Sequence, residues 1–133
     1  GQVTLRKLTT AHDVGTILNP LTHQGQIEGG VAQGIGQALT EHLLIQDGSV
    51  TSLHLGDYKL PTAMDMPELK TVLVESNAGP APYAGKAVGE HSNVAIPAAV
   101  ANAVYDAVGV RLMDLPVTAE KVYASLRRTD KAA

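Results

Sequence analysis

Residues 19–43, which read NPLTHQGQIEGGVAQGIGQALTEHL, decide the fold of this chain. Asn19 is a favoured N-cap residue and Pro20 suits the first helical position, so we expect a helix from there to about Leu43. Apolar residues recur along it at spacings of three and four and form one stripe: Ile27, Val31, Ile35, Ala38, Leu39 and Leu43. The stripe predicts that this helix packs one side against the rest of the chain.

The opposite side of the predicted helix is polar and poor in side chains. It collects Gln26, Gly29, Gly30, Gln33 and Gln37. The helix interior holds Gly29, Gly30, Gly34 and Gly36, and each glycine costs about 0.8–1 kcal/mol relative to alanine. Such a cost indicates that another backbone or a ligand approaches closely. Tight helix packing alone would also explain the glycines, whereas the glutamines beside them favour a polar ligand or partner.

The rest of the chain mixes strands, turns and helices. Strands are expected at Gln2–Ala11, Leu69–Glu75 and Val110–Met113, with a hairpin turn at Asp47-Gly48. Loops are expected at Asp13–Pro20, Leu55–Pro67 and Asn77–Gly89. A helix at Pro97–Ala107 is stopped by Gly109, and a last helix is capped by Thr118 and ends near Arg128. The pattern predicts the α+β class: a mixed sheet, a long glycine-rich helix and two C-terminal helices. The first strand has no partner before it, so its open edge would seek another chain.

Composition excludes several classes of function. The 133 residues carry 10 basic and 13 acidic side chains, a net charge of -3, which argues against nucleic acid as a partner. There is no cysteine, which removes disulfides, thiolate metal sites and cysteine nucleophiles and makes the cytoplasm the default location. No apolar run is long enough to span a membrane, and the first ten residues do not resemble a signal peptide.

Familiar catalytic and binding motifs are also missing. The run Gly29–Gly36 lacks the preceding strand and the third glycine of a dinucleotide-binding fingerprint. The five histidines show no metal-ligand spacing, and no serine elbow occurs.

The loop Tyr83–Glu90, which reads YAGKAVGE, is the remaining candidate for chemistry. Its flanks are small and apolar, so we expect Glu90 to be shielded from water, as suits a general base. Successive amides in a glycine-containing loop could also cradle an anionic cofactor. A structural glutamate at a helix start fits the same pattern equally well.

Three blocks of the sequence resemble one known family in order. They are AHDVG at residues 11–15 with Asn19-Pro20, GQIEGGVAQGIGQAL at residues 25–39, and KAVGE at residues 86–90; the segment DYKLPT at residues 57–62 and the helix that begins at Pro97 agree as well. The chain is similar to the C-terminal part of the molybdopterin-binding large subunit of the xanthine dehydrogenase and aldehyde oxidase family. The resemblance covers nearly the whole chain.

This resemblance implies a function and a site. Glu90 would be the base in the oxidative hydroxylation of an N-heterocycle or aldehyde, and the cofactor would be molybdopterin, or its dinucleotide form, with molybdenum. Gln33 falls where the family hydrogen-bonds its pterin, and Lys86, Ala87, Val88 and Gly89 fall where the backbone meets the cofactor. Iron–sulfur clusters and FAD would lie on partner domains or subunits.

Two departures from the family accompany the resemblance. His91-Ser92 stands where relatives often have two prolines. A molybdenum subunit of this family is also several times longer, so residues 1–133 would form a partial domain, completed by the remainder of the subunit, and the isolated chain would hold no molybdenum and be inactive. The alternative is a non-catalytic fragment or binding module that self-associates through its open edge strand.

Overall fold

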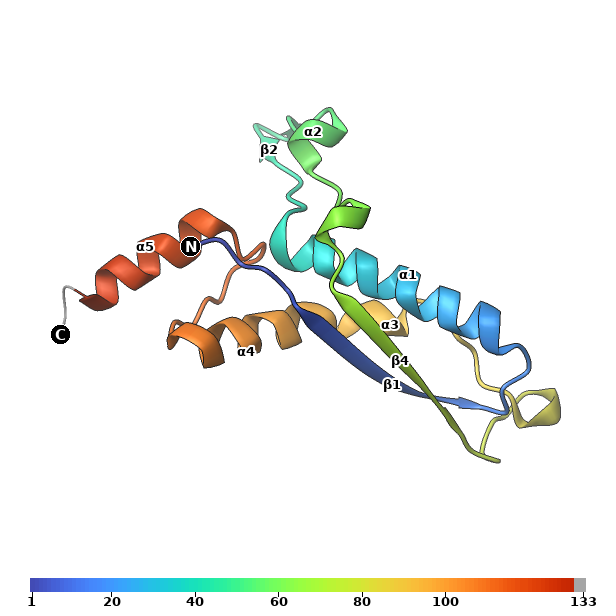
Figure 1. The fold of residues 1–133 in the computed structure, drawn as a ribbon. Helices are drawn as coiled ribbons and strands as arrows, with labels where there is room; N and C mark the ends of the chain where they lie inside the picture. Colours follow the sequence, from blue (N-terminus) through green and yellow to red (C-terminus); the bar gives the residue numbers. More distant parts are fainter. Residues whose placement is uncertain (131–133) are drawn as a thin grey trace.

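A computed structural model describes residues 1–130 of the chain (Figure 1). Its strands are β1 (Lys7–Gly15), β2 (Ile45–Gln46), β3 (Ser49–Val50) and β4 (Glu68–Glu75). Its helices are α1 (Pro20–Leu39), α2 (Leu55–Tyr58), α3 (His91–Val94), α4 (Ile96–Val108) and α5 (Ala119–Asp130), with short 3-10 turns η1 (Ala63–Asp65) and η2 (Pro82–Ala84). The mixture confirms the α+β class.

β1 and β4 form a parallel pair that runs alongside α1 (Figure 1). The register places Lys7 opposite Glu68 and Asp13 opposite Val74, with an irregularity between Asp13 and Gly15. The expected strand at Gln2–Ala11 is therefore misplaced: it begins five residues later and extends into the first three residues of the expected loop, to Gly15. Pairing with β4 sets these bounds, and the local pattern of residues 2–11 contains no information about a partner 61 positions away.

α1 forms because both its ends and its apolar stripe suit a helix. The side chain of Asn19 accepts a hydrogen bond from the amide of Thr22 at 3.2 Å, which confirms the predicted N-cap. The helix ends at Leu39, four residues before the expected end, where Gly36 O accepts from the amides of both Thr40 and Glu41. Ile27, Val31, Ile35 and Ala38 are buried as the stripe predicts, whereas Leu43 lies beyond the helix and is exposed.

The core lies between α1, α4 and the inner face of the β1–β4 pair. Ile27, Val31 and Ile35 of α1 pack there with Ile96 and Val100 of α4. Half-buried strand residues such as Leu8, Leu69 and Leu73 cover this cluster. A second, smaller cluster of Val104, Val117 and Val122 joins α4 to α5. The core thus consists of aliphatic side chains, as a chain without Phe or Trp requires.

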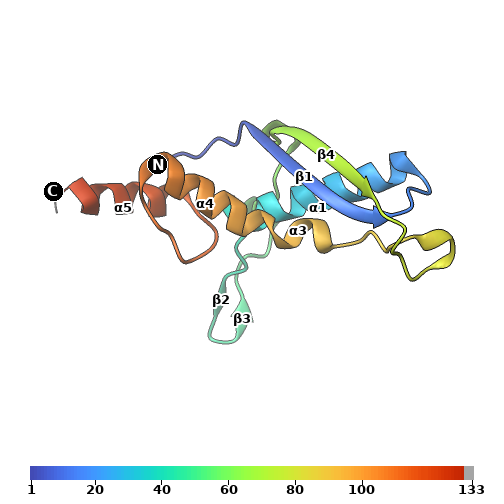
Figure 2. The same ribbon diagram turned by 90° about the horizontal axis from the view of Figure 1, so that it is seen from below.

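The remaining elements confirm the predicted turn at Asp47-Gly48 and the helix stop at Gly109, and they correct one predicted strand. Asp47 and Gly48 both have positive φ and connect β2 to β3, as predicted, and this hairpin projects from the body in two views (Figures 1 and 2). Gly109 adopts the left-handed conformation that ends α4, and its amide donates to Tyr105 O at 2.7 Å. The expected strand at Val110–Met113 is wrong, because no strand pairs with that segment among residues 1–130.

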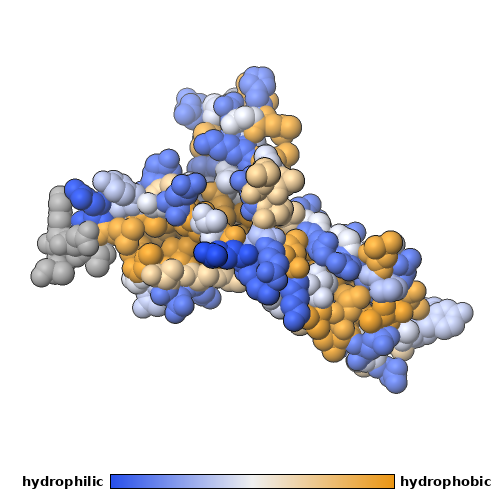
Figure 3. Space-filling model, viewed as in Figure 1, coloured by the Kyte–Doolittle hydropathy of each residue, from blue (hydrophilic) through white to orange (hydrophobic). Residues whose placement is uncertain are grey.

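Among residues 1–130, no strand lies beside the outer edge of β4, and the other edge of β1 is met only by the bridge from Gly15 to Gly85. The outer face of the pair exposes Val72 and Val74. Figure 3, in the same view as Figure 1, shows apolar surface in the region of the strand pair. Parallel sheets are normally larger and covered on both faces. The pair therefore has the geometry of a sheet that further strands can extend.

Candidate functional site

The candidate loop is joined to the end of β1 by main-chain contacts. Gly15 and Gly85 form an isolated bridge, and the amide of Lys86 donates to Val14 O at 3.0 Å. Gly15 has φ +64°, and a Cβ there would collide with Ala84 O. Only glycine meets both requirements, so this approach of loop and strand depends on Gly15.

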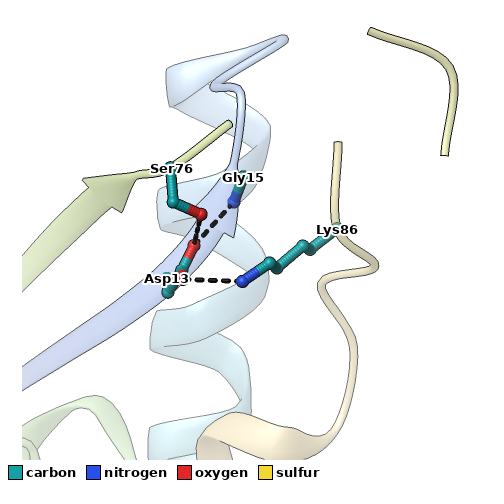
Figure 4. Close-up of polar contacts among 4 residues, drawn as sticks. All are labelled: Asp13, Gly15, Ser76 and Lys86. Atoms are coloured by element: carbon teal, nitrogen blue, oxygen red, sulfur yellow. Dashed lines mark hydrogen bonds and ion pairs between the residues drawn. The ribbon is translucent and has the colours of Figure 1, made fainter. Parts of the chain in front are cut away.

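Asp13 holds the same loop through its side chain (Figure 4). Its carboxylate accepts hydrogen bonds from Lys86 Nζ at 2.6 Å, Ser76 Oγ at 2.7 Å and the amide of Gly15 at 3.0 Å. The Lys86 ammonium, followed by the Gly15 amide and the Ser76 hydroxyl, lowers the pKa of Asp13 to about 2. Asp13 is therefore an ionised acceptor that joins β1, the end of β4 and the loop.

The loop after Lys86 presents main-chain donors. The amides of Ala87 and Val88 make no hydrogen bond among residues 1–130, and the Val88 side chain packs against the core. The amide of Gly89 donates to His91 Nδ1 at 3.3 Å, and a Cβ at Gly89 would meet nothing within 4 Å. Lys86 differs from these three residues, because its ammonium and amide are both engaged with β1.

Glu90 lies at the start of α3, with its carbonyl oxygen accepting from the amide of Asn93 at 3.0 Å. The expected shielding of its side chain is wrong for residues 1–130, where Glu90 is exposed. The shielding was inferred from small flanking residues, but burial depends on what covers a side chain. Asn93 Nδ2 also lies 3.5 Å from Gln33 Oε1, so Glu90 and Gln33 share a neighbour across α1 and α3.

The structure divides the glycines of α1 into two groups. A Cβ at Gly34 would come within 2.5 Å of Ile96 Cβ, and one at Gly30 would overlap Ser92 Oγ. A Cβ at Gly36 would overlap Glu41, whereas one at Gly29 would meet nothing within 4 Å. Tight packing thus accounts for three of these glycines. The expected grouping of Gly30 with the glutamines is wrong, since Gly30 is buried beneath α3.

Gly29 and the glutamines form an exposed face, which we call the glutamine face: Gln26, Gly29, Gln33 and Gln37. Side-chain amides provide both donors and acceptors, and the unused amides of Ala87 and Val88 are further donors. Asn93 connects this face to the loop. A polar, anionic group such as a pterin phosphate fits this donor set.

His12 and His91 come together although they are 79 positions apart in the sequence. Their ring centroids are 4.9 Å apart in an edge-to-face arrangement. Burial, and then the nearby His91, lower the pKa of His12, and His12 Nε2 is buried without a hydrogen-bond partner among residues 1–130. The sequence shows only dispersed histidines, and the contacts between β1 and the Tyr83–Glu90 loop bring these two together.

Two absences hold for residues 1–130. No three His, Asp or Glu side chains gather into a metal-binding group. No helix there has both the length and the apolar character that crossing a bilayer requires.

Comparison with known proteins agrees with this geometry. The family model for the molybdopterin cofactor-binding domain matches residues 1–67, half of the chain. The xanthine dehydrogenase molybdenum-binding subunit of Escherichia coli O157:H7 is 41% identical over 124 residues, which are 92% of this chain and 16% of that protein. Subunit gamma of the 6-hydroxypseudooxynicotine dehydrogenase complex of Paenarthrobacter nicotinovorans is 38% identical over 130 residues, 95% of this chain and 16% of that protein.

A solved structure extends the likeness to the fold. The aldehyde oxidoreductase of Desulfovibrio gigas superposes with a TM-score of 0.86 at 35% identity, over 96% of this chain and 14% of that one. The chain thus spans about a sixth of the length of these relatives. It belongs to the molybdopterin cofactor-binding domain family and corresponds to a segment of the molybdenum-binding subunits of the xanthine dehydrogenase and aldehyde oxidase group.

Proposed function

We propose that residues 1–133 form one wall of a molybdenum cofactor site and that Glu90 is the general base of an oxidative hydroxylation. The substrate class is an N-heterocycle or an aldehyde. The single observation that supports the proposal most strongly is the approach of the Glu90 loop to the glutamine face through Asn93, which contacts both Gln33 and the carbonyl of Glu90.

Each part of the wall has a distinct task in this proposal. The amides of Ala87 and Val88 and the side-chain amide of Gln33 hold molybdopterin or its dinucleotide. Gly89, which has open space at the position of a Cβ, lets the main chain approach the cofactor, and Lys86 fixes the loop through its contacts with β1. When bound, the cofactor supplies the redox chemistry. A carboxylate oxygen of Glu90 accepts the proton of the hydroxyl that attacks the substrate carbon. Loss of this proton makes the hydroxyl oxygen a stronger nucleophile.

The exposure of Glu90 agrees with a wall that other residues complete. The open edges of the β1–β4 pair are where strands from the remainder of a molybdenum-binding subunit would add. Coverage from those residues would exclude water from the carboxylate. Iron–sulfur and flavin centres on partner domains or subunits would then accept the electrons.

A Glu90→Gln substitution in the enzyme assembled with the remainder of its subunit tests the proposal. We expect turnover to fall by about 10²–10⁴-fold, the range that general-base catalysis contributes, while molybdenum and pterin contents stay unchanged. Glu28→Gln is the matched control, because Glu28 accepts from Gln24 along α1 and takes no part in the wall. Unchanged turnover in the Glu90 variant would refute the base assignment.

The alternative function is self-association of a non-catalytic module through the same open edge. It predicts a dimer or larger species of the isolated chain by light scattering. Our proposal predicts instead that the chain binds the remainder of the subunit and that the complex, not the chain alone, retains molybdenum.

A further inference from the structure

Two consecutive residues of β1 hold the two ends of the segment that the proposed function uses. This segment, residues 86–91, contains Ala87–Glu90. Asp13 contacts Lys86 at one end, and His12 contacts His91 at the other. Successive side chains of a strand point to opposite faces, so adjacent residues can reach two separate points of the loop without competing.

The contact of Asp13 with Lys86 is a built network and not a lone surface pair. Asp13 Oδ2 accepts from Lys86 Nζ, while Oδ1 accepts from Ser76 Oγ and the Gly15 amide. The pair is partly covered, with 31% of the Lys86 side chain and 44% of the Asp13 side chain exposed. Charge-assisted hydrogen bonds are shorter and stronger than neutral ones. The start of the loop is therefore fixed by side-chain and main-chain contacts together.

The contact of His12 with His91 fixes the other end. The His91 ring lies against His12 and accepts from the amide of Gly89 through Nδ1, so one imidazole links the inner strand face to the residue before Glu90. Ser92, buried against Gly30, lies with its Oγ 3.4 Å from Gly89 O. Glu90 is consequently flanked on both sides by residues that the strand and α1 hold in place.

We propose that His12 and Asp13, which we call the β1 anchor, are positioning residues that set the place of Glu90. The inference rests on the proposed function for its catalytic consequence. How firmly the loop is held in place, by contrast, can be measured without any cofactor.

Hydrogen exchange of the 133-residue chain tests the anchor. In Asp13→Asn and in Lys86→Met we expect the main-chain amide of residue 86 to exchange about tenfold faster or more, which corresponds to about 1.4 kcal/mol of lost protection. The exchange rate of the Ile35 amide in the core should stay unchanged. Glu68→Gln is the matched control, because Lys7 and Glu68 form a pair of equal length, 2.6 Å, at the other end of the same strands.

The outcomes separate positioning from general stability. Faster exchange at Lys86 alone in both variants, together with recovery in Lys86→Arg, supports the anchor. Equal acceleration at Lys86 and Ile35 overturns it, because the pair would then stabilise the fold as a whole. No acceleration at Lys86 overturns it as well.

A second readout in the assembled enzyme connects the anchor to Glu90. Asp13→Asn should lower kcat with KM and molybdenum content retained, and adding it to Glu90→Gln should cause little further loss, since both act on one group. Independent, multiplicative losses would overturn the positioning role. If Glu90→Gln itself leaves turnover unchanged, the proposed function fails, while the exchange result on the chain still decides whether the anchor orders the loop.

Discussion

The two sides of α1 use glycine for different reasons. Gly30 and Gly34 lie beneath α3 and the start of α4, where added Cβ atoms would overlap Ser92 and Ile96. Gly29, one position before Gly30, has nothing within 4 Å of its missing Cβ and lies on the glutamine face. One side is thus glycine-rich because the chain packs against itself, whereas the other side is exposed within residues 1–130.

The largest effect on stability is expected from Gly34→Ala. The new methyl group would meet Ile96 Cβ at 2.5 Å and Asn93 O at 3.0 Å, so α3 and α4 would have to move. Overpacking of this kind costs about 1–3 kcal/mol, and the gain in helix propensity of about 1 kcal/mol offsets it only in part. Urea unfolding of the chain should show a lower midpoint; a midpoint at or above that of the wild type would refute the packing account.

Gly29→Ala should have the opposite sign. With open space around the Cβ, the chain gains helix propensity of up to about 1 kcal/mol, and its urea midpoint should rise. A fall would show that the exposed face has a structural role within the chain. If stability rises while the assembled enzyme loses pterin, then the space at Gly29 serves the cofactor.

The smallest expected effect is the pH dependence that comes from His12. Its pKa is lowered in the folded chain, chiefly by burial and then by His91. The unfolded chain therefore binds more protons just below pH 6.5, so this contribution to stability is present above that pH and is lost as the pH falls. His12→Phe keeps a ring against His91 without titration. Its unfolding midpoint should decline less between pH 7.5 and 5.5, and an equal decline would contradict the assignment.

Sequence patterns identified the elements whose causes are local. The N-cap at Asn19, the turn at Asp47-Gly48 and the C-cap at Gly109 each depend on a few adjacent residues, and all three are confirmed. β4 was predicted to within one residue, because its Leu69–Glu75 run is rich in β-branched residues. Val110–Met113 begins with a strand-forming valine, but no strand pairs with it among residues 1–130, which shows that a local pattern alone does not make a strand.

The site was less accessible to such patterns. Lys86 and Asp13 are 73 positions apart, and His12 and His91 are 79 apart, so no spacing rule connects them. A signal did exist, because AHDVG and KAVGE both belong to the blocks that resemble the family. Their side-chain contacts nevertheless required the fold, as did the burial of Gly30 and the exposure of Glu90.

The central claim is that Gln33 and the loop beside it form a wall of the cofactor site, and the pterin content of the assembled enzyme tests it most directly. Gln33 contacts Asn93 of α3. Gln37 lies one turn further along the same exposed face, and its side chain makes no hydrogen bond among residues 1–130. We predict that Gln33→Ala lowers the ratio of bound pterin to protein and that Gln37→Ala leaves it near the wild-type value. Full pterin content with unchanged turnover in Gln33→Ala would contradict the account.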